Sequence, residues 1–369
     1  MDGKEVFVIG AGVIGLVAAT EIAKRGIKVT VYDSKKSIEE GADKASGVLS
    51  KRGLDSTGLP YKGSELNVLK GAWLYAGREM LKIKSEEEMA YVIDRKKLAK
   101  LCYEEAKKAG AKVLLGRRIE KERLKELAES GNIIVGADGA VSNVASAFGF
   151  PKIKEYVLTY KAEYSNAEVK DKEMVSLVFS EGARRFFGWS VPYSKSTIEV
   201  GIGISNRAKR SSMQAFKELL EEKPIKEEIE NAKEEAGHAS IIPLSTREKT
   251  AKGNVLLVGD AAGQVKATTG GGIIFGSLCA KEAAAAIEKN IKEGKSLEIY
   301  ERAWRAKYGN ELRLHKIAHE YYSSLSAKSF ERLFRMARIF GMDDFLSAYG
   351  DMDSPSKIVK RFFLRGLAK

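Results

Sequence analysis

A run of hydrophobic residues followed by a helical pattern opens the chain. Val6–Ile9 is short, apolar and β-branched, which is typical of a buried strand. An alanine-rich helix is expected to about Lys24, and Gly26 supplies its stop. A second apolar run over 29–32 ends at Asp33. The pattern predicts a strand–helix–strand unit of the parallel kind.

The turn inside this unit carries a G-x-G-x-x-G motif. Gly10 permits the tight turn, Gly12 lets backbone approach a pyrophosphate, and Gly15 lets helix and strand pack closely. The helix N-terminus presents free N–H groups and a positive dipole end to phosphates. Asp33, eighteen residues after Gly15, suits the hydroxyls of an unphosphorylated adenosine ribose. Together these features predict a dinucleotide site, and the alternative is an ordinary glycine turn in an α/β protein.

The spacing of hydrophobic residues changes along the middle of the chain, between patterns typical of strands and of helices. Strand-like segments are expected near 66–75 and 78–84, with a turn at Gly77, and a helix begins at Asp94 and Arg95. Further buried strands are expected at 112–115 and at 133–139, the second ending in a glycine-acid turn. From about 152 to 204 the pattern becomes period two, which indicates an antiparallel sheet. A charged helix is expected over roughly 211–236, a buried strand over 255–260, a helix to about 289, and amphipathic helices over 296–369.

This order predicts the α/β class with α+β insertions. A Rossmann-type nucleotide-binding domain is joined to an antiparallel-sheet substrate domain and C-terminal helices. We expect the nucleotide-binding domain to be discontinuous. The expected segments are 1–60, 93–150 and 246–290 for the nucleotide-binding domain, 61–92 for strands contributed to the substrate domain, 151–245 for the antiparallel-sheet domain, and 291–369 for the C-terminal helical region.

Composition describes a folded, basic protein. The 369 residues are 44% hydrophobic and 31% charged, which excludes disorder, and Lys and Arg (63) exceed Asp and Glu (50) by 13. The basic residues are spread along helices rather than clustered with aromatic residues, so no nucleic-acid partner is expected. An anionic membrane surface or a phosphorylated substrate suits this charge equally well, and solvated surface residues account for most of it. Abundant Lys and Glu with few Gln are typical of thermophiles.

The cysteines and the apolar runs indicate the cellular compartment of the protein. Cys102 and Cys279 show no disulfide or metal-binding spacing and are expected to be small core residues in a reducing compartment. The apolar N-terminal run is assigned to the first strand rather than to a signal peptide, and no apolar run is long enough to span a membrane. A cytoplasmic protein is expected, with peripheral contact to a membrane left open.

A second glycine-rich motif lies between Val255 and Ile273. A strand ends at Gly259 and Asp260, and Gly270–Gly272 precede an alanine-rich helix. This places a carboxylate and bare backbone at the C-terminal edge of a parallel sheet, where ligands bind in open α/β folds. A glycine hinge would explain the glycines but not the carboxylate at the end of the strand.

Together with Asp138, in the sequence Ala137-Asp138-Gly139-x-x-Ser142, these motifs resemble the flavoproteins of the p-hydroxybenzoate hydroxylase fold. Within that group the chain resembles the geranylgeranyl reductase family, which includes archaeal digeranylgeranylglycerophospholipid reductases. The resemblance covers nearly the whole chain. It implies FAD bound in an extended form, with a helix N-terminus that stabilises the negative charge of the reduced flavin. The cofactor-binding residues that it implies are Gly10, Gly12, Val13, Ile14, Gly15, Asp33, Arg95, Asp138, Gly259, Asp260, Gly271, Gly272 and Ile273.

On the substrate side the resemblance involves a stretch of the form YxWxFP. Here it reads Phe187-Gly188-Trp189-Ser190-Val191-Pro192, which keeps an apolar wall but loses a tyrosine hydroxyl. Phe187, Trp189, Pro192 and Leu49 are the candidates for lining a substrate pocket, and plain packing in the sheet core is the alternative. Ala45 stands where family members often carry a cysteine beside the flavin, and Ala267 stands where a proline is usual.

The resemblance implies a reductase that saturates carbon–carbon double bonds in a polyprenyl lipid or prenyl diphosphate. The electron donor would be reduced ferredoxin or NAD(P)H, and no residue is assigned as the proton donor. An aromatic hydroxylase, an electron-transferring dehydrogenase or a non-catalytic flavin-binding sensor on the same fold are the alternatives. His315 and His319 have helical i, i+4 spacing but no third ligand, so no metal site is expected. No nucleophile elbow or Walker loop is present.

Overall fold

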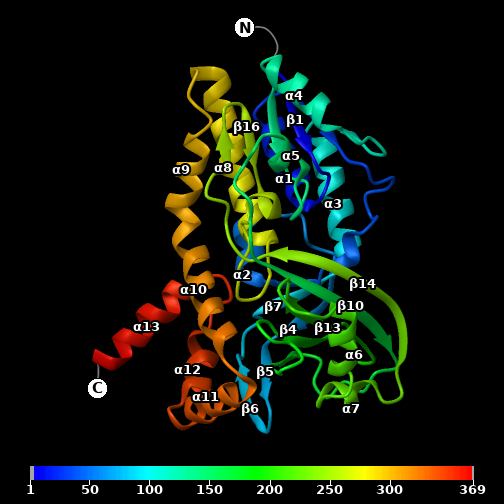
Figure 1. The fold of residues 1–369 in the computed structure, drawn as a ribbon, viewed down its shortest axis with the longest axis vertical. Helices are drawn as coiled ribbons and strands as arrows, with labels where there is room; N and C mark the ends of the chain where they lie inside the picture. The colour runs from blue at the N-terminus through cyan, green and yellow to red at the C-terminus, as the bar shows by residue number, and fades with distance from the viewer. Residues whose placement is uncertain (1–3, 368–369) are drawn as a thin grey trace.

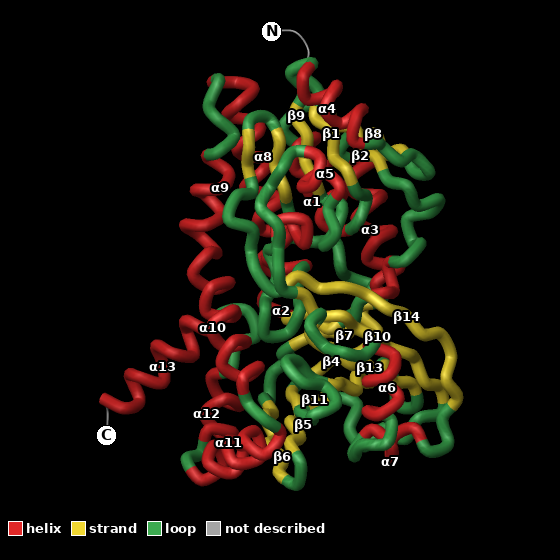
Figure 2. The backbone as a smooth tube through the Cα atoms, viewed as in Figure 1, coloured by secondary structure: helices red, strands yellow, loops and turns green. Residues whose placement is uncertain are grey.

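The computed structural model describes residues 4–367. One half of the molecule contains a six-stranded sheet and the other half a seven-stranded sheet, with a small three-stranded sheet near their junction (Figures 1 and 2). The six-stranded sheet has the order β15-β16-β9-β1-β2-β8 and is parallel except for β15. Its strands are β1 (Val6–Ile9), β2 (Val29–Tyr32), β8 (Lys112–Leu114), β9 (Ile133–Gly136), β15 (Ala251–Lys252) and β16 (Val255–Leu257).

Helices cover both faces of this parallel sheet, because a sheet of buried strands must be shielded from water on each side. On one face α1, α3 and α8 pack into the largest hydrophobic core. On the other face α4 and α5 pack against Phe7, Ile134 and Leu257. The helices are α1 (Val13–Ala23), α3 (Arg95–Lys108), α4 (Lys121–Glu129), α5 (Asn143–Ala147) and α8 (Ile273–Glu293). The expected strand–helix–strand unit at the N-terminus is thus confirmed. Cys102 and Cys279 are buried and free, as expected.

The single strand-like segment expected near 66–75 is wrong, because Lys70 divides it between two sheets. Before it, β4 pairs with β7 in the small sheet β3-β7-β4, and after it, β5 joins the seven-stranded sheet. Gly77 turns the chain into β6 with φ +58°, as its position predicted. These elements are η1 (Ala42–Lys44), β3 (Val48–Ser50), α2 (Lys51–Thr57), β4 (Glu65–Leu69), β5 (Gly71–Ala76), β6 (Glu79–Lys84) and β7 (Ala90–Ile93).

The seven-stranded sheet has the order β14-β10-β13-β12-β11-β5-β6. Its pairs are antiparallel, as the period-two pattern predicted, except that β5 runs parallel to β11, an arrangement that the long connection between these two strands permits. Its later strands are β10 (Tyr156–Ser165), β11 (Met174–Val178), β12 (Gly188–Pro192), β13 (Thr197–Ser205) and β14 (Lys233–Pro243).

The long charged helix expected over 211–236 is also wrong. The segment forms two short helices, α6 (Ser212–Leu219) and α7 (Ile225–Ile229), and then the start of β14. Pro224 lies between the helices and cannot donate a backbone hydrogen bond. Lys233–Glu235 pairs with the end of β10 at the sheet edge, where charged side chains stay exposed. The two helices cover one face of the sheet.

The C-terminal third is helical and runs along one side of the molecule (Figure 1). Helices α11 and α12 pack against β6, while α13 projects away from the body (Figure 1). Within residues 4–367, no helix combines the length and apolar character that a membrane span requires. The elements are η2 (Gly259–Ala262), α9 (Ile299–Trp304), η3 (Arg305–Gly309), α10 (Asn310–Ser324), α11 (Ala327–Ile339), α12 (Met342–Tyr349) and α13 (Pro355–Leu367).

Candidate cofactor and substrate site

The glycines of the first turn have separate physical roles. Gly10 has φ +106°, and a Cβ on it would lie 2.4 Å from the carbonyl oxygen of Ala137. A Cβ on Gly15 would lie 1.8 Å from the carbonyl oxygen of Gly10, so helix and strand approach too closely for any side chain. A Cβ on Gly12 would meet no atom within 4 Å. Gly12 therefore faces open space at the start of α1, where a ligand phosphate can reach the helix N-terminus.

Asp33 lies at the end of β2 and braces this turn. Its carboxylate accepts hydrogen bonds from the backbone N–H groups of Ala11 (2.6 Å) and Lys35 (2.9 Å). The ammonium of Lys35 donates to the carbonyl of Ala11 (2.7 Å), and burial lowers the pKa of this lysine. Lys35 belongs to no motif, so only its contact with the turn reveals it.

Arg95 and Asp260 come from segments distant in sequence, and their opposite charges interact in the structure. Arg95 is the first residue of α3, whose N-cap is Asp94, and its Nε is buried without a hydrogen-bond partner. Asp260 is the second residue of the short helix η2, which follows β16. Burial raises the pKa of Asp260 to about 6, against the opposing effect of the Arg95 charge. Among the described residues no ion pair within 4 Å joins the two, so each retains hydrogen-bonding capacity for a third group.

The second glycine motif closes over Asp260. A Cβ on Gly272 would lie 2.6 Å from Oδ1 of Asp260, so the backbone before α8 passes directly beside this carboxylate. A Cβ on Gly259 would lie 3.0 Å from Cγ2 of Ile14, on the first turn of α1. The structure thus brings the two glycine-lined strand ends together. Val13 and Ile273 begin α1 and α8 and are buried, and Gly271 lies between Lys266 and the start of α8.

These residues fit a flavin dinucleotide. The orphaned Nε of Arg95 is a donor suited to a phosphate, and the carboxylate of Asp260 is an acceptor suited to ribityl hydroxyls. The open space at Gly12 leaves room for a pyrophosphate at the start of α1. Asp138 differs, because its two carboxylate oxygens accept hydrogen bonds from Ser142 (2.6 Å) and Val144 (3.0 Å) and so fix the start of α5. A direct role of Asp138 toward FAD stays a prediction.

The predicted substrate residues do not all face one way. Phe187 and Trp189 belong to an apolar cluster that includes Ala267 from the loop before α8. Leu49 packs instead into the core of the parallel sheet, and Val48 contacts the cluster in its place. Pro192 lies on the other face of β12 with Ser190, because side chains alternate along a strand. The alternation was visible in the sequence, but which face would be covered by helices was not.

A buried polar network orients Trp189. Its indole Nε1 donates to Glu199 (2.8 Å), which also accepts from Lys161 Nζ (2.6 Å) and from the Tyr193 hydroxyl (2.6 Å). Lys161 and Glu199 are 3% and 0% exposed, so the pair is stabilised by these hydrogen bonds rather than by water. Gly201 makes room for the indole, since a Cβ there would lie 2.2 Å from its Cζ2. The sequence signal for this network, a Lys and a Glu inside apolar strands, was overlooked.

Two histidines expected not to bind metal have other partners. His315 Nδ1 lies 2.7 Å from the Thr268 hydroxyl, and burial lowers the pKa of this residue to about 4. His319 Nε2 donates to the carbonyl of Arg185 (3.0 Å), because a carbonyl can only accept.

Comparison with known proteins supports this assignment. Residues 4–278 match the family described as "FAD binding domain". The chain belongs to this FAD-binding family. FAD is therefore its cofactor, and the protein is an FAD-dependent oxidoreductase.

Among its relatives is an uncharacterized protein of Methanocaldococcus jannaschii, MJ1520, which is 30% identical and covers 96% of this chain and 93% of its own. A digeranylgeranylglycerophospholipid reductase of the same archaeon is 29% identical over 92% of this chain and 91% of its own. These relatives confirm the resemblance to the geranylgeranyl reductase family.

Solved structures agree on the fold. A geranylgeranyl bacteriochlorophyll reductase-like protein, Ta0516 of Thermoplasma acidophilum, aligns with a TM-score of 0.81 at 21% identity, covering 96% of this chain and 94% of its own. A variant of the flavin-dependent brominase Bmp2 aligns with a TM-score of 0.69 at 13% identity, covering 99% of this chain and all of its own. At these identities the likeness shows a shared fold. Proteins that share one fold can catalyse different reactions.

Proposed function

We propose that this protein reduces carbon–carbon double bonds in the geranylgeranyl or related polyprenyl chain of a lipid, in the manner that the names of its archaeal relatives suggest. The observation that carries the proposal is the apolar cluster around Phe187 and Trp189, which extends to Ala267 in the loop before α8, the helix that we expect to bind the flavin. A substrate bound there would lie among hydrocarbon and aromatic side chains beside the cofactor.

The chemistry matches such surroundings. When bound and reduced, FAD supplies a hydride. An isolated alkene has no carbonyl to polarise, so the protein must hold it in place and exclude water. Phe186 and Phe187 stack with centroids 4.2 Å apart, and Phe187 meets Trp189 edge-on at 6.2 Å, which gives a rigid apolar wall. The Glu199 network fixes the indole of Trp189 in this wall.

The C-terminal helices supply a surface that suits a membrane-borne substrate. Helix α11 exposes Met336, Ile339 and the adjoining Phe340 by 54%, 71% and 69%. Beside them Arg335 and Arg338 share one carboxylate, that of Glu79, so the two arginines keep an excess of positive charge. A basic amphipathic helix of this kind binds at the surface of anionic lipids. We include peripheral contact with a membrane in the proposal.

A reoxidation experiment, with oxygen excluded except where it is added as a reactant, tests the proposed function. Photoreduced holoprotein is mixed in turn with a geranylgeranyl lipid, a soluble quinone, and oxygen with an aromatic acid. A prenyl reductase is reoxidised by the lipid. Reoxidation by the quinone alone would favour an electron-transferring dehydrogenase, hydroxylation with oxygen a monooxygenase, and no reaction with any of them a sensor.

A further inference from the structure

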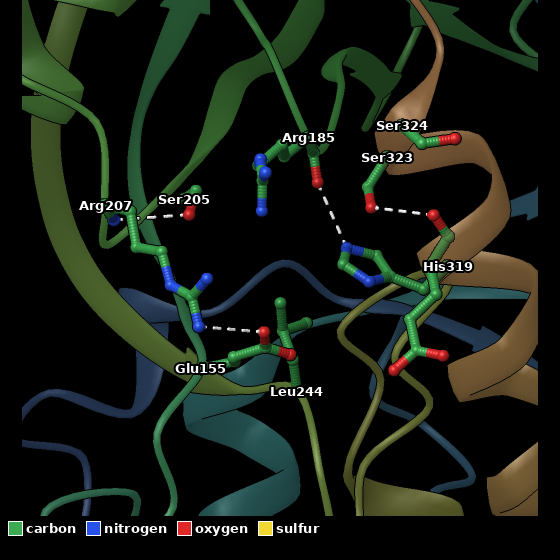
Figure 3. Close-up of a pocket in the computed structure, with 9 residues that line it drawn as sticks. Glu155, Arg185, Ser205, Arg207, Leu244, His319, Ser323 and Ser324 are labelled. Atoms are coloured by element: carbon green, nitrogen blue, oxygen red, sulfur yellow. Dashed lines mark hydrogen bonds and ion pairs between the residues drawn. The ribbon is translucent and has the colours of Figure 1, made fainter.

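A polar pocket lies apart from the Gly12 and Asp260 region, on the far side of Phe186. It measures about 200 Å³ and lies between α10, the end of β13 and the segment before β12 (Figure 3). Its lining residues are Glu155, Arg185, Ser205, Arg207, Leu244, His319, Glu320, Ser323 and Ser324. Of the residues singled out in the sequence, His319 alone is among those lining residues.

Two guanidinium groups converge on this pocket. The side chains of Arg185 and Arg207 enter it from different segments and point toward its centre (Figure 3). Arg207 donates to Glu155 (3.1 Å) through one nitrogen and keeps its other N–H groups. Within residues 4–367 the guanidinium of Arg185 has no hydrogen bond or ion pair. Both arginines are exposed, so their unpaired N–H groups face solvent at the pocket, where a planar array of donors can bind a phosphate.

The backbone at Arg185 is held in an uncommon conformation. Its φ is +72°, in the left-handed region that a non-glycine residue seldom adopts. The bond from His319 Nε2 to the Arg185 carbonyl fixes this conformation (3.0 Å, Figure 3). Strained backbone persists where its surroundings enforce it, and such positions concentrate at binding sites.

The acidic residues of the pocket are already neutralised. Lys316 lies 3.1 Å from Glu155 and 3.0 Å from Glu320, and its hydrogen bond lowers the pKa of Glu155. Three cations (Arg185, Arg207 and Lys316) therefore stand against two carboxylates. The buried hydroxyl of Ser205 accepts from the backbone N–H of Arg207 (3.2 Å), which leaves its own proton free to donate.

We propose that this pocket is a binding site for a phosphate group. Arg185 and Arg207 bind the phosphate oxygens, and Ser205 donates a further hydrogen bond. The site itself does not depend on the proposed function. Where that function holds, the phosphate is the head group of the prenyl substrate, because Phe186 belongs to the apolar cluster, stacks on Phe187 and has its ring centroid 6.4 Å from that of His319 in the pocket.

Calorimetric titration of FAD-saturated protein tests the proposal, with inorganic phosphate and geranylgeranyl phosphate as separate ligands. Arg185→Gln and Arg207→Gln should each weaken binding of inorganic phosphate at least tenfold. The matched control is Arg184→Gln, which removes an equal charge from an exposed neighbour that does not line the pocket and that, among residues 4–367, has its one ion pair with Glu181. It should change the affinity less than twofold.

Competition then distinguishes the sources of the phosphate. Displacement of geranylgeranyl phosphate by inorganic phosphate would place the lipid head group in this pocket. Simultaneous binding of both would assign the pocket to a separate phosphorylated molecule. The proposal is overturned if the native protein shows no saturable binding of phosphate, or if Arg185→Gln and Arg207→Gln bind it like the control. Failure of alkene reduction alone would leave the inorganic phosphate result intact and refute only the proposed function.

Discussion

The ammonium of Lys266 lies 2.6 Å from Oδ1 of Asp353, and both side chains are nearly excluded from solvent. Lys266 belongs to the loop that leads into α8, whereas Asp353 lies between α12 and α13. The other oxygen of Asp353 accepts a hydrogen bond from Ser50, in β3. One carboxylate therefore fastens the C-terminal helices to two segments that we expect beside the flavin.

Replacing Asp353 by Ala should lower the free energy of unfolding by about 3–5 kcal/mol, because it leaves the Lys266 charge buried without a partner. The double variant Lys266→Met/Asp353→Leu should be more stable than either single variant. Urea unfolding at a fixed FAD concentration measures all of these. Lys226→Met, which breaks an exposed pair with Glu221, is the control and should leave the free energy of unfolding nearly unchanged. Equal losses in the single and double variants would contradict a coupled buried pair.

Gly12 and Gly15 should respond to the same substitution in opposite ways. Gly15→Ala forces a methyl group onto the carbonyl of Gly10 and should prevent stable folding. Gly12→Ala has room within the protein, so the stability without FAD should change by less than about 1 kcal/mol. FAD affinity should nevertheless fall at least tenfold, because the methyl group occupies the space of the pyrophosphate. Calorimetry of FAD binding checks this, and an unchanged affinity for Gly12→Ala would place the pyrophosphate elsewhere.

The stability of the FAD-free protein should depend on Asp260 between pH 4 and pH 7. Burial raises the pKa of this carboxyl to about 6, so the folded state binds more protons than the unfolded state in that range. Its contribution is therefore full below about pH 4 and is lost as the pH rises through about 6. Relative to Asp260→Asn, the native protein should lose on the order of 1–3 kcal/mol across this interval. Parallel unfolding profiles for the two proteins would show that Asp260 titrates normally.

The exposed apolar end of α11 should govern contact with lipid vesicles. Ile339→Glu and Phe340→Glu should reduce cosedimentation with anionic vesicles several-fold and leave thermal stability unchanged, because both side chains are largely exposed. Val141→Glu is the matched control, since Val141 is also 71% exposed but lies on the loop before α5. Loss of binding in all three variants would indicate a general charge effect, and no loss in any would remove this helix from the membrane surface.

Local signals were sufficient for much of the fold. The strand–helix–strand unit, the start of α3 at Asp94 and Arg95, and the strand before Asp260 depend on residues adjacent in sequence, and the structure contains all of them. The start of β14 was instead predicted to be part of a charged helix. This strand begins with Lys233, Glu234 and Glu235. Its charges resemble those of a surface helix, and only its pairing with β10 makes it a strand.

The site was harder to predict from the sequence, because it depends on contacts between residues that are far apart in the chain. Leu49 and Pro192 lie in apolar strands, but which face of a strand meets the substrate side depends on what covers the other face. The pair of Lys266 and Asp353 spans 87 residues, and no spacing rule connects them. Arg185 gives no sequence signal at all, because its importance rests on a backbone angle and on the convergence of three separate segments.

The central claim is that this flavoprotein reduces prenyl double bonds, and a single-turnover measurement on the lipid tests it most directly. Reduced holoprotein is incubated without oxygen with a geranylgeranyl glycerophospholipid, and the extracted lipid is analysed by mass spectrometry. The account predicts that the lipid gains two hydrogens for each flavin that is reoxidised. A lipid of unchanged mass, with the flavin still reduced, would contradict it.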